Sequence, residues 1–294
     1  METEMESFEI FTRYQRTNWT FGDLPWGEFD RARISPDDIK FARAAVMGEA
    51  TFIGGLHTFL NEGEGDYDLS CFASIWAYQE LQHHFAFRTW LKRLDADVDQ
   101  KPVEAMRPPF PVGHSLAQTL CTNIISELVI CHVYHQMSLR VTDPVLRAIF
   151  VHASGDEGRH AQAFAHYTRA ELARHPAELA TVLETLYFYA GDRRKPVRHP
   201  SSVFKGELPP ELSGHDTIDV GLEYFAGLDE NKLDSLRRRV FQTFSTLTGC
   251  ALDSPRAIRA ALNEALKTRE QLLARPAGDC GLEVTAAAGA KASS

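Results

Sequence analysis

Apolar residues recur at three- and four-residue intervals along most of this chain, which is the pattern of amphipathic helices. The first such segment follows Ser35 and Pro36, a helix-capping residue and a proline suited to the first helical position, and predicts a helix over residues 36–61. A second segment covers residues 67–94, after two closely spaced glycines. Because the connection is short, these two helices are predicted to form an antiparallel hairpin.

A second hairpin is predicted further along. Residues 95–113 contain four prolines, so they favour an irregular connection over a helix. About 18 extended residues span about 60 Å, whereas a helix of about 27 residues is about 40 Å long. The connection can therefore run the length of a bundle. Helices over about 114–141 and 144–174 would follow, and the whole predicts an all-α four-helix bundle with one long crossover.

The predicted organisation has four parts. They are an aromatic-rich N-terminal segment (1–35), the four-helix bundle (36–175), additional helices packing on or capping the bundle (176–275) and a disordered tail rich in Ala, Gly and Ser (276–294). Within the third part, helices are expected at about 177–190, 231–247 and 255–273, with an irregular stretch at 191–214 and a short helical pattern at 223–225.

The sequence contains two copies of a short motif whose residues can bind metal ions. Glu-x-x-His occurs as Glu80 with His83 and as Glu157 with His160, and at no other place in the sequence. A lone glutamate on an apolar segment precedes each copy, 31 residues earlier in the first case and 30 in the second. These two residues are Glu49 and Glu127.

This set of side chains suits a pair of metal ions. Residues i and i+3 project from the same helix face, so each motif offers both groups to one site. Four carboxylates carry a charge of about minus four, which two divalent cations neutralise, and each imidazole adds a nitrogen ligand. The alternative is two surface Glu/His pairs worth a few tenths of a kcal/mol, but their neighbours are apolar. The pattern therefore predicts a site for two iron or manganese ions.

The six residues and the run Asp156-Glu157-Gly158-Arg159-His160 resemble the non-haem diiron carboxylate enzymes of the ferritin-like superfamily, nearest the soluble acyl-carrier-protein desaturases and the multicomponent monooxygenases. The resemblance covers about residues 36–172 and implies a ferritin-like bundle, two iron ions, with manganese–iron as an alternative, and dioxygen as co-substrate. It also implies a hydrogen bond between Asp156 and His83. A solvated salt bridge between Asp156 and Arg159 is the alternative.

Several positions depart from these relatives. Phe87 stands where ribonucleotide reductase small subunits carry a radical tyrosine, and Ala153 stands where arylamine N-oxygenases carry an extra histidine. His152, next to it, is expected to point away from the metal ligands. Cys131 takes the place of a threonine that lines the dioxygen pocket. His84 is the best candidate for an additional group at the metals, with a histidine of the core as the alternative.

Composition and charge limit the functional classes and the cellular location that can be expected. At 294 residues and 44% hydrophobic content the chain can bury a large core. A net charge of −9 disfavours nucleic-acid binding. No apolar run reaches the roughly 20 residues of a membrane span, and the acidic residues 1–9 do not resemble a signal peptide, so a cytoplasmic protein without membrane attachment is expected. Five scattered cysteines suggest reduced core residues.

The expected function is a dioxygen-dependent diiron oxidase or oxygenase that desaturates or hydroxylates a hydrophobic or carrier-bound organic substrate. N-oxygenation of a small secondary metabolite is an alternative, as are a ferroxidase or iron-storage protein and a structural bundle without metal. Basic runs at 193–195 and 237–239 are candidate docking sites for an acidic carrier, or simply solvated charges. No flavin, nicotinamide or iron–sulfur motif is present, so a ferredoxin or reductase is the expected electron donor. A homodimer is also expected.

Overall fold

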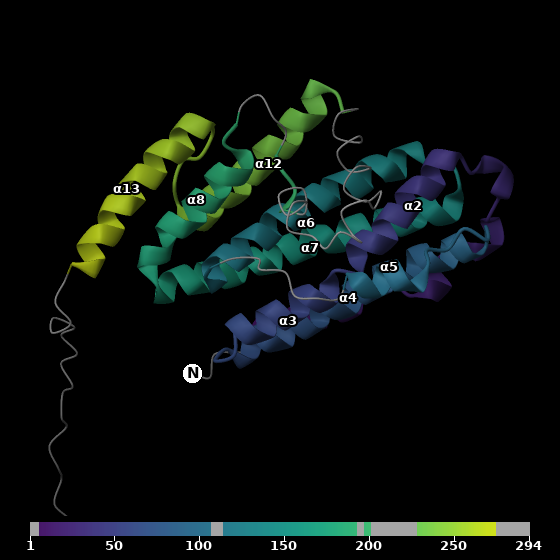
Figure 1. The fold of residues 1–294 in the computed structure, drawn as a ribbon, viewed down its shortest axis with the longest axis horizontal. Helices are drawn as coiled ribbons and strands as arrows, with labels where there is room; N and C mark the ends of the chain where they lie inside the picture. The colour runs from purple at the N-terminus through teal and green to yellow at the C-terminus, as the bar shows by residue number, and fades with distance from the viewer. Residues whose placement is uncertain (1–5, 107–113, 193–196, 201–227, 275–294) are drawn as a thin grey trace, which may run out of the picture.

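Long helices lying side by side build the protein (Figure 1). The computed structural model describes residues 6–106, 114–192, 197–200 and 228–274, and these contain helices and turns but no strand. The central helices are α2 (Pro36–Glu49), α3 (Phe52–Glu62), α4 (Tyr67–Lys92), α6 (Leu116–Arg140) and α7 (Pro144–Arg174). Around them lie α1 (Glu6–Thr17), α5 (Gln100–Ala105), α8 (Leu179–Ala190), α12 (Glu230–Thr248) and α13 (Pro255–Leu273), with 3-10 turns at Phe21–Asp23, Trp26–Glu28, Arg31–Arg33 and Pro176–Glu178.

The first hairpin begins as predicted, because Ser35 and Asp38 form a reciprocal capping box at the start of α2. The prediction of one unbroken helix over 36–61 was wrong. At its end, the backbone N–H of Thr51 bonds the carbonyl of Gly48, three residues back, and the Thr51 hydroxyl bonds the same carbonyl at 2.8 Å. These local bonds compete with the regular helical pattern and separate α2 from α3. Glu49 is consequently the last residue of α2.

A tight turn joins α3 to α4. Gly63 ends α3, and a Cβ atom at this position would lie 2.7 Å from Leu69 Cδ2 and 2.9 Å from the carbonyl oxygen of Phe59. Asp66 then caps α4 by accepting a hydrogen bond from the backbone N–H of Leu69. A glycine is therefore required where the chain folds back on itself, and the predicted first hairpin has the expected turn.

The second hairpin pairs α6 with α7, close to the predicted ranges. Its turn depends on Asp143, which is fully buried and caps α7 through Leu146 N–H at 2.8 Å. The same carboxylate accepts hydrogen bonds from Trp90 Nε1 at 2.8 Å and from Asp30 N–H at 3.1 Å. One side chain therefore ties α4, α7 and the N-terminal segment together.

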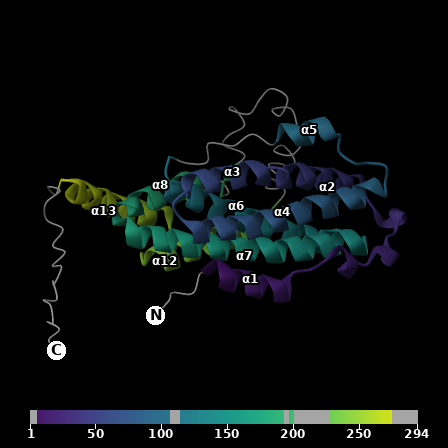
Figure 2. The same ribbon diagram turned by 90° about the horizontal axis from the view of Figure 1, so that it is seen from below.

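The crossover between the hairpins is only partly irregular, since α5 interrupts it. Its residues 107–113 lie outside the described part of the chain. In the rest of the fold, α4 packs against α2, α3 and α7, while α6 packs along α7 and touches α3. Figure 2 shows α1 on the outside of these helices, where it contacts α4.

Two buried apolar clusters fill the interior. One includes Phe72, Trp76 and Phe164, and the other includes Phe87, Trp90 and Phe150. On α4 the motif residues Glu80 and His83 fall between Trp76 and Phe87, so the candidate site lies between the two clusters. Its polar groups are therefore enclosed on both sides by hydrophobic packing.

The additional helices predicted after the bundle are present. α8 packs on α6, α13 packs on α8, and α12 contacts both α6 and α7, so these helices gather on one side of the central ones (Figure 1). α13 has the predicted bounds. Gly249 caps the end of α12, and its φ of 70° is the left-handed conformation that favours glycine just after a helix. The predictions for 201–214, 223–225 and the tail from 276 lie outside the described residues.

One described helix, α6, has the length and apolar content of a membrane span. However, 67% of its apolar window is buried inside the protein, as in the core helix of a soluble protein.

We predict that Asp143→Ala lowers the free energy of unfolding by about 2 to 4 kcal/mol, because it removes a helix cap and leaves buried donors without partners. The measurement is denaturant unfolding followed by circular dichroism. The matched control is Asp229→Ala, which removes the exposed cap of α12 and should cost about 1 kcal/mol. Equal losses in the two variants would contradict the role of the shared contacts.

Candidate metal centre

The six predicted ligands converge in the interior from four helices. Each is at most 6% exposed. They fall into two groups, each offering four ligand atoms within 4.8 Å of one another: Glu49, Glu80, His83 and Glu157, and Glu80, Glu127, Glu157 and His160. Glu80 and Glu157 belong to both groups. The structure thus contains two adjacent places for a metal ion with two shared carboxylates.

Both histidines turn Nδ1 toward the carboxylates of the cluster. The other ring nitrogen, Nε2, has a partner outside the cluster: His83 Nε2 lies 3.1 Å from Asp156 Oδ2, and His160 Nε2 lies 2.9 Å from Gln79 Oε1. Because both partners are acceptors, each Nε2 carries the hydrogen in the neutral ring and Nδ1 carries a lone pair.

These lone pairs face other acceptors. His83 Nδ1 lies 3.4 Å from Glu157 Oε1 and 3.6 Å from Glu49 Oε2 and has no hydrogen bond, and His160 Nδ1 lies 3.0 Å from Glu80 Oε1. Glu80 Oε1 also lacks a hydrogen-bond partner despite its burial. Lone pairs converging in this way need a proton or a metal cation between them, so the residues present fit a metal site.

The pKa shifts of these residues also indicate a site that attracts positive charge. Burial raises the pKa of Glu80 and Glu127 well above the usual range, and the nearby charge of Glu157 adds to this. Burial alone would lower the pKa of His83 and His160, but hydrogen bonds to the surrounding carboxylates raise it well above the usual value. The cluster therefore attracts positive charge, as protons or as bound cations.

Asp156 is a buried hub behind His83. Besides the imidazole, it accepts hydrogen bonds from Trp19 Nε1 at 2.8 Å, from Gln79 Nε2 at 3.2 Å and from Arg159. Burial acts to raise its pKa, but the hydrogen bond from His83 and the neighbouring positive charges lower it to about 2. The contact with His83 that the resemblance implies is present, and so is the contact with Arg159.

Two partners of this hub were not identified from the sequence. Gln79 joins Asp156 to His160 through the two ends of its amide; its only sequence signal is its place beside Glu80 on the ligand-bearing helix. Trp19 stacks parallel to His83, with ring centroids 6.3 Å apart, and also on His152. Nothing local in the sequence locates Trp19, because its position depends on how the N-terminal segment packs on the bundle.

Aromatic donors hold two of the carboxylates. Tyr134 donates its hydroxyl hydrogen to Glu49 Oε1, and Trp76 Nε1 donates to Glu127 Oε1 at 3.2 Å. Tyr134 itself packs against Phe87 and Phe150. Trp76 lies on the same helix as Glu80, and Tyr134 lies on the same helix as Glu127, but helical spacing does not indicate that they bond carboxylates of the cluster.

Two further candidates point elsewhere. His84 Nδ1 lies 3.0 Å from the backbone carbonyl of Val46, so this histidine joins α4 to α2. Cys131 Sγ lies 3.1 Å from Arg239 Nη1 on α12 and 3.7 Å from Ser154 Oγ. The structure therefore brings neither residue into the groups that can hold a metal ion.

The chain matches no protein-family model and no curated protein sequence. The fold and the site define a protein that is helical over its described residues and contains a buried carboxylate and imidazole cluster that can hold metal ions. Any more specific assignment rests on the geometry described above.

We predict that Asp156→Ala weakens metal binding by about 10- to 100-fold, because it removes the acceptor that orients His83. The measurement is an anaerobic titration with ferrous iron. His84→Ala is the control, because His84 bonds the backbone carbonyl of Val46 instead of a residue of the cluster, and the metal affinity of this variant should match that of the unchanged protein. Equal affinity in the Asp156 variant would show that this carboxylate has no part in positioning the histidine.

We predict that Tyr134→Phe reduces metal affinity by about 3- to 10-fold while the protein stays folded, since the ring keeps its packing and Glu49 loses one hydrogen bond. The same iron titration measures this. Tyr167→Phe is the control because the Tyr167 hydroxyl bonds Asp68 instead of a residue of the cluster. An equal loss in both variants would trace the effect to general loosening of the core.

Proposed function

We propose that the cluster binds two iron ions and that the protein is a dioxygen-dependent oxidase or oxygenase of the ferritin-like diiron type. The observation that carries this proposal is the pair of four-residue groups that share Glu80 and Glu157. Two shared carboxylates and one terminal imidazole for each group are the ligands of a two-metal centre.

The type of donor favours this choice of metal. The six ligands are carboxylates and imidazoles, with no thiolate among them. Such ligands suit iron or manganese, whereas iron–sulfur clusters and many zinc sites are held by thiolates. Four carboxylates also balance two divalent ions, so the loaded centre can remain buried at a tolerable cost. Manganese in one of the two places is compatible with the same ligands.

The arrangement of helices supports the ferritin-like type. The hairpin of α2, α3 and α4 and the hairpin of α6 and α7 follow one another through a long crossover. The lone glutamates lie on α2 and α6, and the Glu-x-x-His motifs lie on α4 and α7. This alternation is how helix-bundle diiron proteins distribute their ligands.

Iron held by these residues would supply the activation of dioxygen. The contribution of the protein is to exclude water and to keep the ligands in place. The two apolar clusters enclose the site, Asp156 and Gln79 hold the imidazoles, and Tyr134 holds Glu49. Such preorganisation keeps reactive oxygen chemistry away from solvent.

For the substrate, we propose a hydrophobic or carrier-bound organic molecule that is desaturated or hydroxylated, with electrons from a ferredoxin or reductase. Enclosure of the centre by apolar side chains is the support for a hydrophobic substrate. Support from the basic run at 237–239 is weaker, because Arg239 bonds Cys131 and Arg237 bonds the carbonyl of Asp192. The run at 193–195 lies outside the described residues.

We predict that the iron-loaded protein consumes dioxygen and that Glu80→Gln abolishes this consumption, because the substitution keeps the side-chain shape but removes a shared charge. The measurement is dioxygen uptake after anaerobic loading, with mass analysis of candidate fatty-acyl products. Glu171→Gln is the control, a buried carboxylate on α7 away from the cluster. Uptake that survives in the Glu80 variant would contradict the proposal.

A further inference from the structure

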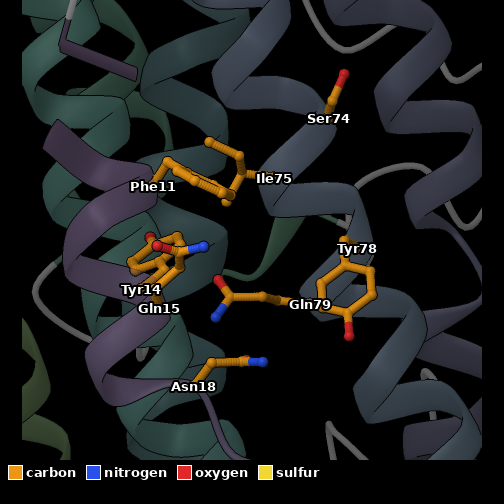
Figure 3. A pocket seen from close by; sticks show the side chains of 8 residues that line it. All are labelled: Phe11, Tyr14, Gln15, Asn18, Ser74, Ile75, Tyr78 and Gln79. Carbon is orange, nitrogen blue, oxygen red and sulfur yellow. The ribbon is translucent and has the colours of Figure 1, made fainter. Parts of the chain in front are cut away.

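A cleft lies between α4 and the N-terminal segment that contains α1 (Figure 3). Its volume is about 280 Å³, close to the lower end of the about 300 to 1,000 Å³ typical of small-molecule sites. It is lined by Phe11, Tyr14, Gln15, Asn18, Ser74, Ile75, Tyr78 and Gln79. None of these side chains is charged, so the cleft suits a neutral molecule.

Two of the lining residues carry buried polar atoms that lack a partner. Tyr14 Oη and Asn18 Oδ1 have no hydrogen bond, although Tyr14 is only 5% exposed. Buried polar atoms are almost always paired, because leaving them unpaired costs free energy. Both atoms are enclosed in this structure, so a ligand reaches them only when the two side chains turn toward the cleft. A ligand that accepts from the tyrosine hydroxyl and donates to the amide oxygen would then satisfy both.

Aromatic rings form the rest of the surface. Phe11 and Tyr78 remain 43% and 59% exposed on the two helices that border the cleft, and Tyr14 adds a third ring. Flat faces of this kind pack well against another aromatic ring. The lining therefore favours a planar, aromatic ligand over a branched or charged one.

The inner end of the cleft touches the residues that hold the metal ligands. Gln79, which extends from α4 toward Tyr14 in Figure 3, bonds His160 Nε2 at 2.9 Å. The Tyr14 ring meets the His160 ring edge-on, with centroids 6.3 Å apart. A molecule in the cleft is thus one side chain away from His160, behind the imidazole and separate from the converging carboxylates.

We propose that this cleft is an accessory binding site for a small, neutral aromatic compound with a hydroxyl group. Its O–H group donates to Asn18 Oδ1, its oxygen accepts from the hydroxyl of Tyr14, and its ring packs against Phe11 and Tyr78. Binding itself does not depend on the proposed metal centre. Only an influence of the ligand on His160, through Gln79, rests on that function.

The experiment uses the full chain, with and without ferrous iron, and three probes of similar shape: phenol, anisole and benzene. Phenol can donate and accept, anisole can only accept, and benzene can do neither. Affinities are measured by ligand-detected NMR. We expect phenol to bind more tightly than anisole, and anisole more tightly than benzene, each by about 2- to 10-fold, the effect of one hydrogen bond.

Two substitutions assign these differences to single atoms. Asn18→Leu should remove the advantage of phenol over anisole, and Tyr14→Phe should remove that of anisole over benzene. Neither breaks a hydrogen bond of the Tyr14 hydroxyl or the Asn18 amide oxygen, since both atoms are unpaired. The control is Tyr189→Phe, at a buried tyrosine on α8 that does not line the cleft.

Equal affinity for the three probes, or probe preferences that both cleft variants retain, would overturn the proposal. Phenol binding with the expected preferences in a protein that binds no iron would support the cleft and contradict the proposed function. Iron binding without phenol binding would do the reverse. The two proposals can therefore fail separately.

Discussion

Four carboxylates lie together in the hydrophobic interior of this protein, and the rest of the structure depends on how their charge is balanced. Unpaired, such a group is too costly to bury. The two imidazoles that face them present lone pairs, so they do not neutralise the cluster unless they are protonated. Cations bound among these side chains would resolve the conflict, and the described residues include two groups that could hold them.

The surrounding structure is organised in shells around this charge. Hydrogen bonds from Tyr134 and Trp76 fix two carboxylates, while Asp156 and Gln79 fix the imidazoles. Outside these groups, apolar clusters on both sides exclude water. The N-terminal segment completes the arrangement, since Trp19 stacks on His83 and Tyr14 of α1 contacts the ring of His160.

Local spacing was sufficient to predict the six converging residues and most helix bounds. Residues i and i+3 share a face of any helix, and Ser35 followed by Pro36 marks the start of α2 from local sequence alone. Contacts between residues far apart in the sequence could not be predicted in this way. The position of Trp19 depends on packing between segments 137 residues apart, and His84 and Cys131 turn away from the cluster to meet α2 and α12. The break before Thr51 depends on hydroxyl and carbonyl geometry that helical periodicity does not reveal.

The most direct test of the two-ion centre is the number of metal ions that each chain binds. Metal-free protein is equilibrated anaerobically with excess ferrous iron, unbound iron is removed, and iron is determined per chain by elemental analysis. The geometry predicts two ions per chain in the unchanged protein and loss of iron when both His83 and His160 are replaced by alanine. One ion per chain, or iron that remains in the doubly substituted protein, would contradict the account.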